Sequence, residues 1–343
     1  MPISLNAEWS RQSAIILAWP HLQSDWHAIL EDAERVYCDL ARHITRFEKL
    51  LILYHDAEHQ QHIHSLLDPQ TLEYDRIIWA QAVSNDSWAR DFGPITVTSD
   101  GHPLLLDFTF NGWGNKYPAD LDNQITRHLY MCGVFNNVRL NSLDFILEGG
   151  AIDTDGRGTL LTTRRCLLAP TRNPQLDQAG IEAKLAEALG INHFLWLEHG
   201  ELAGDDTDSH IDMLARFCNH STIAFSHCDD PADQHFESLQ AMFQELQQMQ
   251  SQDGTPYDLV PLPIPQAKFD DHGQRLPASY ANFLIINDAV LVPVYDDPAD
   301  QIALERLQSC FPDLEIIAIN CLPLIKQYGS LHCVTMQLPE GVL

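Results

Sequence analysis

Four evenly spaced strand-turn-strand patterns most constrain what this sequence can fold into. Each joins two short apolar-rich runs through a two-residue turn signal, and they cover residues 95–108, 145–163, 210–227 and 282–295. Their tips are Asp100-Gly101, Asp155-Gly156, Asn219-His220 and Asn287-Asp288. The tips recur roughly every 55 to 70 residues, which indicates a repeated strand-strand-helix-strand unit.

Helical periodicity fills the intervals between the hairpins. Apolar residues at i, i+3 and i+4 predict helices at about 25–46, 119–131, 176–188, 233–250 and 299–310. A fifth unit can be completed only if the C-terminal HCVTMQL pairs with N-terminal material such as SAIILAW. We therefore expect an α/β propeller that closes on itself, with residues 1–343 forming a single domain. The alternative is an open doubly wound sheet, which requires alternating parallel strands and helices instead of hairpins.

The excess of acidic over basic residues limits which classes of molecule the protein is expected to bind. The chain has 48 acidic and 20 basic residues, for a formal net charge of -28. Such a charge repels phosphate backbones and anionic lipid, and it raises the local concentration of small cations. We therefore do not expect the protein to bind nucleic acid or membrane surfaces, and we expect it to bind a small cation.

Targeting and redox signals are weak. The N-terminal segment shows no basic region followed by an apolar run and a small-residue cleavage site, and no apolar run approaches the ~18 residues of a membrane span. The eight cysteines contain no CxxC pair, so neither a disulfide framework nor a zinc knuckle is indicated. We expect a cytoplasmic protein with reduced thiols.

Three segments carry side chains that could perform chemistry. In GDDTDSHIDMLARF (204–217), a strand would place His210 and Asp212 on one face. The alternative is a histidine at the rim of a sheet beside turn-forming aspartates. The segment SNDSWARDFGP (84–94) presents an aromatic and carboxylates ahead of a strand, but taken alone it is a turn with charged residues.

The third segment, YGSLHCVTMQLP (328–339), contains Cys333. A buried core thiol is the ordinary interpretation of a lone cysteine. If the segment is a strand, His332 points to the opposite face, so a base for this thiol must come from elsewhere in the chain.

Together the three segments offer an aromatic ring, two carboxylates, an imidazole and a thiol. Two carboxylates can grip the planar, cationic fork of a guanidinium group. A thiolate can then attack the central carbon while a histidine protonates the departing ammonia and later activates water.

These motifs, together with LEGGAIDTDGRGTLLTTRRCLLAPTRNP (147–174), FNGWGNKYP (110–118) and SYANFLIINDAVLVPVYDDPAD (279–300), resemble the agmatine deiminase family, which includes bacterial peptidylarginine deiminases. The resemblance runs from about Glu8 to Pro339. It implies a five-bladed pentein propeller and hydrolysis of a guanidino group through a covalent thiouronium intermediate, without metal or other cofactor. It also implies a place in putrescine and polyamine biosynthesis.

The resemblance also assigns roles to individual residues. Cys333 corresponds to the nucleophile and His210 to the general acid/base, while Asp91 and Asp212 correspond to the carboxylates that hold the guanidinium. Four further residues correspond to parts of the substrate pocket, and they are Trp88, Trp113, Glu148 and Asn282. For Glu148 and its glycines, a tight hairpin turn is an equally good interpretation. We expect a structural role for Asp86.

Departures from the family pattern concern the pocket walls. The family's GGGxIHCxTQQ is QYGSLHCVTMQ here, so Gln327 and Tyr328 replace two glycines, and Ser209 replaces a common glycine. The stretch around Trp113 has only Lys116 as a cation, whereas the peptidylarginine branch supplies arginines for the substrate carboxylate. Agmatine is therefore favoured, with conversion to N-carbamoylputrescine and ammonia.

Several alternatives stay open. Peptidylarginine or free arginine could be the substrate, an amidinotransferase would use the same thiol, and a non-catalytic pentein would only bind. The histidine-rich YHDAEHQQHIHS (54–65) could hold a metal ion if His55, His59 and His62 share a helix face, but a histidine-rich surface helix is the favoured interpretation. The DTDG run (153–156) is expected to be a hairpin turn and not a calcium loop. A homodimer is a candidate assembly without a sequence signature.

Overall fold

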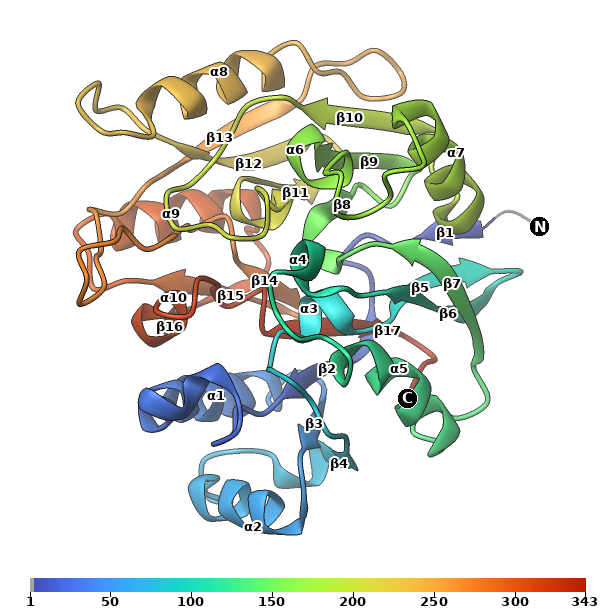
Figure 1. The fold of residues 1–343 in the computed structure, drawn as a ribbon. Helices are drawn as coiled ribbons and strands as arrows, with labels where there is room; N and C mark the ends of the chain where they lie inside the picture. The colour runs from blue at the N-terminus through green and yellow to red at the C-terminus, as the bar shows by residue number, and fades with distance from the viewer. Residues whose placement is uncertain (1–2) are drawn as a thin grey trace.

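The strands of the computed structural model, which describes residues 3–343, form five separate sheets (Figure 1). We number these sheets as blades 1 to 5 in chain order. Each blade contains an antiparallel hairpin, a helix, and a strand that runs parallel to the second hairpin strand. The fold is the predicted five-bladed α/β propeller.

Blades 3 to 5 are the minimal form of this unit. Blade 3 has β8 (Ile152–Thr154), β9 (Thr159–Thr163), α7 (Gln178–Leu189) and β10 (His193–Leu197). Blade 4 has β11 (Ala215–Asn219), β12 (Thr222–His227), α8 (Phe236–Leu246) and β13 (Asp258–Pro263). Blade 5 has β14 (Leu284–Ile286), β15 (Ala289–Val294), α9 (Asp300–Cys310) and β16 (Glu315–Asn320).

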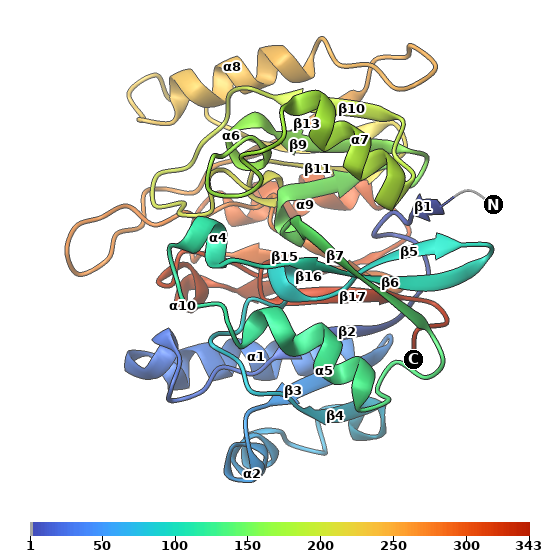
Figure 2. The same cartoon turned by 45° about the vertical axis from the view of Figure 1, so that its right-hand side comes forward.

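Blades 1 and 2 each carry an additional strand. Blade 2 has β5 (Ile95–Ser99), β6 (His102–Thr109), α5 (Ile125–Met131) and β7 (Arg139–Ile146), and β1 (Ile3–Leu5) pairs with β5 at its edge (Figure 2). Blade 1 has β17 (Thr335–Pro339), β2 (Gln12–Ala18), α1 (Leu30–Ile44) and β3 (Lys49–Tyr54), followed by α2 (Ala57–Leu66) and β4 (Ile77–Gln81).

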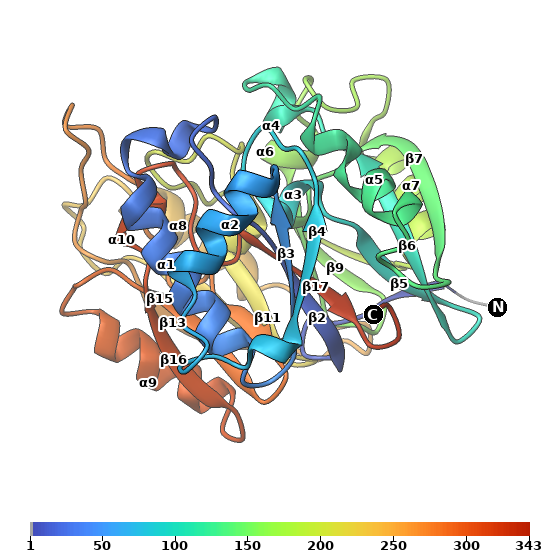
Figure 3. The ribbon, with the colours of Figure 1, turned by 90° about the horizontal axis from the view of Figure 1, so that it is seen from below.

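Blade 1 closes the propeller. Its hairpin is made of strands from opposite ends of the chain, with β17 antiparallel to β2 and Thr335 opposite Leu17 (Figure 1). This pairing confirms the predicted fifth unit. Helices pack across the junctions between blades, since α1 packs against β16 and α9 against β13 (Figure 3), and α7 packs against β1 (Figure 2).

Turn chemistry and burial explain why the repeats form. The tip between β5 and β6 has positive φ at Asp100 (56°) and Gly101 (76°), the conformation of a tight hairpin turn that glycine and aspartate tolerate. The inner strands are apolar and buried on both faces, as in β15, where Ala289, Val290 and Leu291 are fully buried.

Several predictions needed correction at element boundaries. Residues 145–146 end β7, so the hairpin predicted from 145 to 163 begins only with β8 at Ile152. The Gln-rich tract after Leu246 leaves the helix, and Gln250 forms an isolated bridge with Pro256. Residues 155–158 do form the predicted hairpin turn, in which Asp155 accepts hydrogen bonds from two backbone N–H groups.

Short helices outside the repeats position the side chains discussed below. They are α3 (Ala89–Phe92), α4 (Gly112–Asn115), α6 (Arg164–Leu167), α10 (Leu322–Ile325), η1 (Asp25–Ala28), η2 (Tyr74–Arg76), η3 (Asp122–Gln124), η4 (Gly149–Ala151) and η5 (Ile211–Met213). Within residues 3–343 no helix has both the length and the apolar character needed to cross a membrane.

Candidate active site

A cavity of about 490 Å³, measured with its mouth, gathers side chains from the loops that connect the blades. Its inner walls carry Trp88, Asp91, Trp113, His210 and Cys333. Acidic and aromatic residues line its other parts, and they include Asp25, Asp86, Tyr117, Asp205, Asp206 and Tyr328. The structure thus places residues separated by up to 308 positions in the sequence, from Asp25 to Cys333, around one space.

Cys333 lies in a turn and not in the predicted strand, since β17 begins at Thr335. The backbone N–H of Arg90 donates to the Cys333 carbonyl (3.2 Å), which ties this turn to α3. The Asn282 amide nitrogen lies 3.3 Å from the Cys333 sulfur, and Asp212 Oδ2 lies 3.8 Å from it. The sulfur therefore faces polar groups and the cavity, and not hydrocarbon.

The surroundings of Cys333 favour the thiol over the thiolate. Burial raises the pKa of Cys333 well above its ordinary value, and the nearby Asp212 and Asp91 raise it further.

Asp91 is held at the opposite wall by two donors. Trp113 Nε1 donates to Oδ2 (2.9 Å), and the backbone N–H of Gly150 donates to Oδ1 (3.0 Å). Burial raises the pKa of Asp91 well above its ordinary value, with a contribution from the neighbouring Asp212. Two carboxylates so close together without a cation between them are electrostatically unfavourable. The pair is thus suited to a positively charged ligand.

His210 completes the group. Its Nδ1 lies 3.7 Å from Asp91 Oδ1, and its Nε2 is buried without a hydrogen-bond partner. Burial lowers the pKa of His210 to about 3, so the imidazole is neutral near pH 7. A Cβ placed on Gly150 would lie within 3.1 Å of His210, Asp91 and Asp212, which shows that all three converge on one point.

The predicted strand at His210 and Asp212 is wrong, although both side chains reach the site. Residues 211–213 form η5, and β11 begins only at Ala215. Asp208 (φ 68°) and Ser209 (φ 65°) both adopt left-handed backbone, which turns the chain sharply before His210. Ser209 therefore adopts a backbone conformation that glycine tolerates best.

A buried network behind Asp212 was missed by sequence reasoning. The His332 ring bridges two carboxylates, with Nδ1 2.8 Å from Asp212 Oδ2 and Nε2 2.8 Å from Glu8 Oε2. Burial alone would raise the pKa of Asp212, but the His332 hydrogen bond and the charges of His332, His210 and Arg216 together outweigh it and hold the pKa below its ordinary value. The alternation of side chains along a strand predicts that His332 lies on the face opposite Cys333. That alternation does not apply here, because both residues lie in a turn.

Glu8 had no signal in the sequence at all. Arg216 Nη2 lies 2.7 Å from its Oε2, and the backbone N–H of Ile285 donates to its Oε1 (2.7 Å). Although burial would raise the pKa of Glu8, Arg216 and His332 hold it below its ordinary value. Only the folded structure brings the segment before β2 against residues more than 200 positions away.

Glu148 is fully buried between β7 and η4 and does not close a hairpin, so that alternative is wrong. Arg172 Nε donates to both Glu148 oxygens (2.9 and 3.1 Å), and its Nη1 donates to Asp208 (2.7 Å). This ion pair anchors the η4 glycines beside Asp91.

Trp88 forms the aromatic wall. Its Nε1 donates to Asp86 (3.1 Å), and its ring packs against Trp26 with centroids 5.4 Å apart. Asp86 also accepts from Trp26 Nε1 (2.8 Å), which agrees with its expected structural role. A Cβ on Gly329 would lie 2.2 Å from the Trp88 ring, so only glycine fits there.

The histidine-rich segment forms a surface helix, as favoured. His55 precedes the helix cap Asp56, so it does not share a helix face with His59. The backbone N–H of His55 donates to His59 Nδ1 (3.0 Å), and His62 Nε2 lies 2.8 Å from Glu34. His59 Nδ1 and His62 Nε2 are thus engaged by the protein, whereas His55 Nδ1 is buried without a hydrogen-bond partner.

Comparisons with known proteins agree with the geometry. Residues 4–339 match the family model described as Porphyromonas-type peptidyl-arginine deiminase. The structure of a "putative arginine deiminase" from Porphyromonas gingivalis is 48% identical, with a TM-score of 0.94 and 99% of each chain covered. The agmatine deiminase of C. jejuni, solved as a Cys-to-Ser variant with substrate bound, is 37% identical, with a TM-score of 0.92 over 99% of this chain and 97% of that one.

A further relative is a "putative agmatine deiminase" from Vibrio parahaemolyticus, which is 34% identical over 97% of this chain and 96% of its own length. The family model and this relative both extend over nearly the whole chain, including every segment that contributes to the cavity. The chain therefore belongs to the Porphyromonas-type peptidyl-arginine deiminase family.

Proposed function

We propose that this protein hydrolyses the guanidino group of agmatine to N-carbamoylputrescine and ammonia. The observation that carries the proposal is the convergence of Asp91, Asp212 and His210 around Gly150, with the Cys333 sulfur beside them. The family membership and the substrate-bound C. jejuni relative support it.

The two carboxylates bind the substrate in this proposal. Asp91 and Asp212 grip the guanidinium from two sides, and a cation between them relieves their mutual repulsion. The Trp88 ring covers the flat cation or the alkyl arm. Trp113 holds Asp91 in place through its Nε1–H.

The cation also activates the nucleophile. The same carboxylates that raise the pKa of Cys333 are neutralised by the guanidinium, so binding favours the thiolate. The thiol proton passes to the neutral His210, whose Nδ1 faces the carboxylate pair. The Asn282 amide, 3.3 Å from the sulfur, stabilises the charge on the sulfur.

The bonds then change in two steps. The Cys333 sulfur attacks the central carbon, and one terminal C–N bond breaks as His210 delivers a proton to the departing ammonia. Water then attacks the thiouronium carbon and gives up a proton to His210, and the C–S bond breaks to release the ureido product and the thiol. These two steps require no oxidant and no metal ion.

The cavity mouth favours agmatine over arginine or an arginyl peptide. Asp25 and Asp206 line the mouth, and these carboxylates suit the second ammonium of agmatine. The nearby Lys116 donates to the Asp206 carbonyl (2.5 Å) and Asp208 (2.9 Å), so this cation is already paired. A substrate carboxylate would meet acidic groups there.

A panel of guanidines tests the proposal. The protein is incubated with agmatine, arginine and an arginyl peptide, and ammonia and ureido product are measured. Ammonia from agmatine is expected; citrulline from arginine or the peptide would reassign the substrate, and product formed only with an added amine would indicate an amidinotransferase. If no product forms from any of the guanidines, the protein is a non-catalytic binding module.

The nucleophile has its own test. Cys333→Ala should reduce turnover to background while leaving the far-ultraviolet circular dichroism and the melting temperature nearly unchanged, because the side chain lies at a cavity wall. Cys218→Ala, which removes a buried thiol outside the cavity, serves as the control and should retain turnover. Equal activity of the Cys333 variant and the wild type would refute the assignment.

We also propose a cytoplasmic location, supported by the free state of all eight cysteines, which suits a reducing compartment. Fractionation of cells that express the protein tests the location. We also propose a homodimer, and a measurement of the molecular mass in solution tests this proposal.

A further inference from the structure

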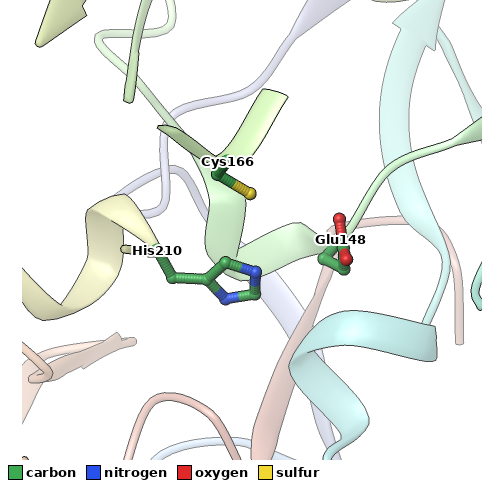
Figure 4. Close-up of side chains that lie close together, drawn as sticks. All are labelled: Glu148, Cys166 and His210. Atoms are coloured by element: carbon green, nitrogen blue, oxygen red, sulfur yellow. The ribbon is translucent and has the colours of Figure 1, made fainter. Parts of the chain in front are cut away.

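A second thiol lies on the far side of the His210 ring. Cys166 is fully buried in α6, and its sulfur faces the ring together with the Glu148 carboxylate (Figure 4). One donor atom from each of Glu148, Cys166 and His210 lies within 4.8 Å of the other two. Among residues 3–343 this is the one group of three or more potential ligands brought so close together.

The His210 ring presents a free donor to this group. Nδ1 faces Asp91, so the edge that faces Cys166 and Glu148 in Figure 4 is the Nε2 edge. Nε2 is buried and has no hydrogen-bond partner. A buried nitrogen without a partner is costly, and a metal ion is one group that can satisfy it.

We propose that Glu148, Cys166 and His210 form a binding site for a soft divalent cation of the Zn²⁺ type, and that an ion bound there blocks the reaction. Thiolate, imidazole and carboxylate are the ligands that Zn²⁺ takes, at about 2.0 to 2.3 Å. Donors at most 4.8 Å apart need to move by less than about 1 Å each to reach those bond lengths.

The surrounding charge tolerates the ion. The carboxylates of Asp91, Asp208 and Asp212 lie around Glu148 and His210, and they outnumber the two neighbouring cations, Arg172 and Lys116. Glu148 can turn one oxygen to the ion while the other keeps its hydrogen bond from Arg172. Cys166 binds the ion as a thiolate, so binding releases the thiol proton.

The consequence for catalysis rests on the proposed function. An ion on Nε2 makes the ring a poor base at Nδ1, so His210 can no longer accept the Cys333 proton. His210 lines the cavity whereas Glu148 and Cys166 lie behind it, so the ion enters past the ring. Bound substrate should slow this entry.

Cobalt titration of the full-length protein tests the site without any turnover. In a Cys333→Ala background, Co²⁺ should produce a thiolate-to-cobalt charge-transfer band with one ion per chain, and Zn²⁺ should remove it. The band should disappear in Cys166→Ser and persist in Cys218→Ser, a matched buried thiol. A band that persists in Cys166→Ser, or no band at all, would overturn the site.

A second variant guards against loss of folding in Cys166→Ser. Glu148→Gln should weaken Co²⁺ binding by about tenfold or more, and unchanged affinity would overturn the site. In the chain that retains Cys333, Zn²⁺ should inhibit agmatine turnover, and Cys166→Ser should require about tenfold more Zn²⁺ for the same inhibition. If Zn²⁺ inhibits Cys166→Ser and the wild type equally, the inhibiting ion binds Cys333 and the proposed mode of inhibition is refuted. If the wild type shows no turnover of agmatine, only the proposed function is refuted.

Discussion

At the scale of single residues, the site depends on groups held in states that are unfavourable without substrate. Asp91 has a raised pKa and His210 a lowered one, both because of burial. Tyr328 (φ 65°) and Ser209 (φ 65°) occupy left-handed backbone, a conformation that favours glycine. Such local cost is typical of binding sites, where the rest of the fold supplies the stability.

Glu48, outside the cavity, shows how a buried carboxylate shapes the pH dependence of stability. Its Oε2 accepts from the Asn287 N–H (2.9 Å), its Oε1 is buried without a partner, and burial raises its pKa from 4.5 to about 7. Between these pH values the folded state keeps a proton that the unfolded state has lost. This group therefore makes the protein less stable as the pH rises from 4.5 through 7.

Glu48→Gln should remove that dependence. We expect the variant to be more stable than the wild type by about 1 to 3 kcal/mol at pH 8, with the difference vanishing near pH 4.5. Denaturant unfolding at the two pH values measures the difference. If the difference in unfolding free energy between variant and wild type is equal at both pH values, Glu48 does not titrate in this range.

At the scale of elements, the repeating parts were predictable and the irregular parts were not. The turn signals at Asp100-Gly101 and Asn287-Asp288 are local, so the hairpins followed from the sequence. The short helix η5 replaced a predicted strand because Asp208 and Ser209 turn the chain before His210. Glu8 and His332 escaped prediction because their value lies in contacts across the propeller.

The short helix η4 provides the sharpest test at this scale. Gly150→Ala should abolish agmatine turnover, because its Cβ would lie 2.6 Å from His210 Nδ1 and 2.9 Å from Asp91 Oδ1. The φ of Gly150 is not positive, so backbone strain does not complicate the result. Initial rates and the melting temperature are the measurements.

Gly180→Ala in α7 is the matched control. Alanine is the better helix former by about 1 kcal/mol, but its Cβ would lie 3.2 Å from Leu176 Cδ2 and 3.3 Å from Asp177 Oδ1. This variant should therefore keep full activity with a stability near that of the wild type. Full activity in Gly150→Ala would show that the three side chains do not bind the substrate together.

At the scale of the whole molecule, closure through β17 and β2 links the blades. Glu8 adds links to Arg216 in blade 4, Ile285 in blade 5 and His332 beside blade 1. We propose that residues 1–343 unfold as one unit. Tryptophan fluorescence and circular dichroism should then give coincident denaturant transitions, and two separated transitions would contradict a single domain.

The net charge of -28 predicts a salt effect on substrate capture. Raising the ionic strength from about 0.01 M to about 1 M shortens the screening length from about 30 Å to about 3 Å. The KM for agmatine, a dication, should rise more than the KM for butylguanidine, a monocation. Equal rises would show that the field of the protein does not discriminate between the two charges.

The position of Cys333 within the chain has a consequence for synthesis on the ribosome. The side chains that line the cavity begin with Asp25, shortly after β2, but the sulfur is translated only after all five helices of the repeats. A nascent or prematurely terminated polypeptide therefore lacks the reactive atom, however many blades it has already folded. Deiminase activity in a cell-free translation reaction should appear only after a lag that matches complete elongation, which makes the enzyme a reporter of full-length product.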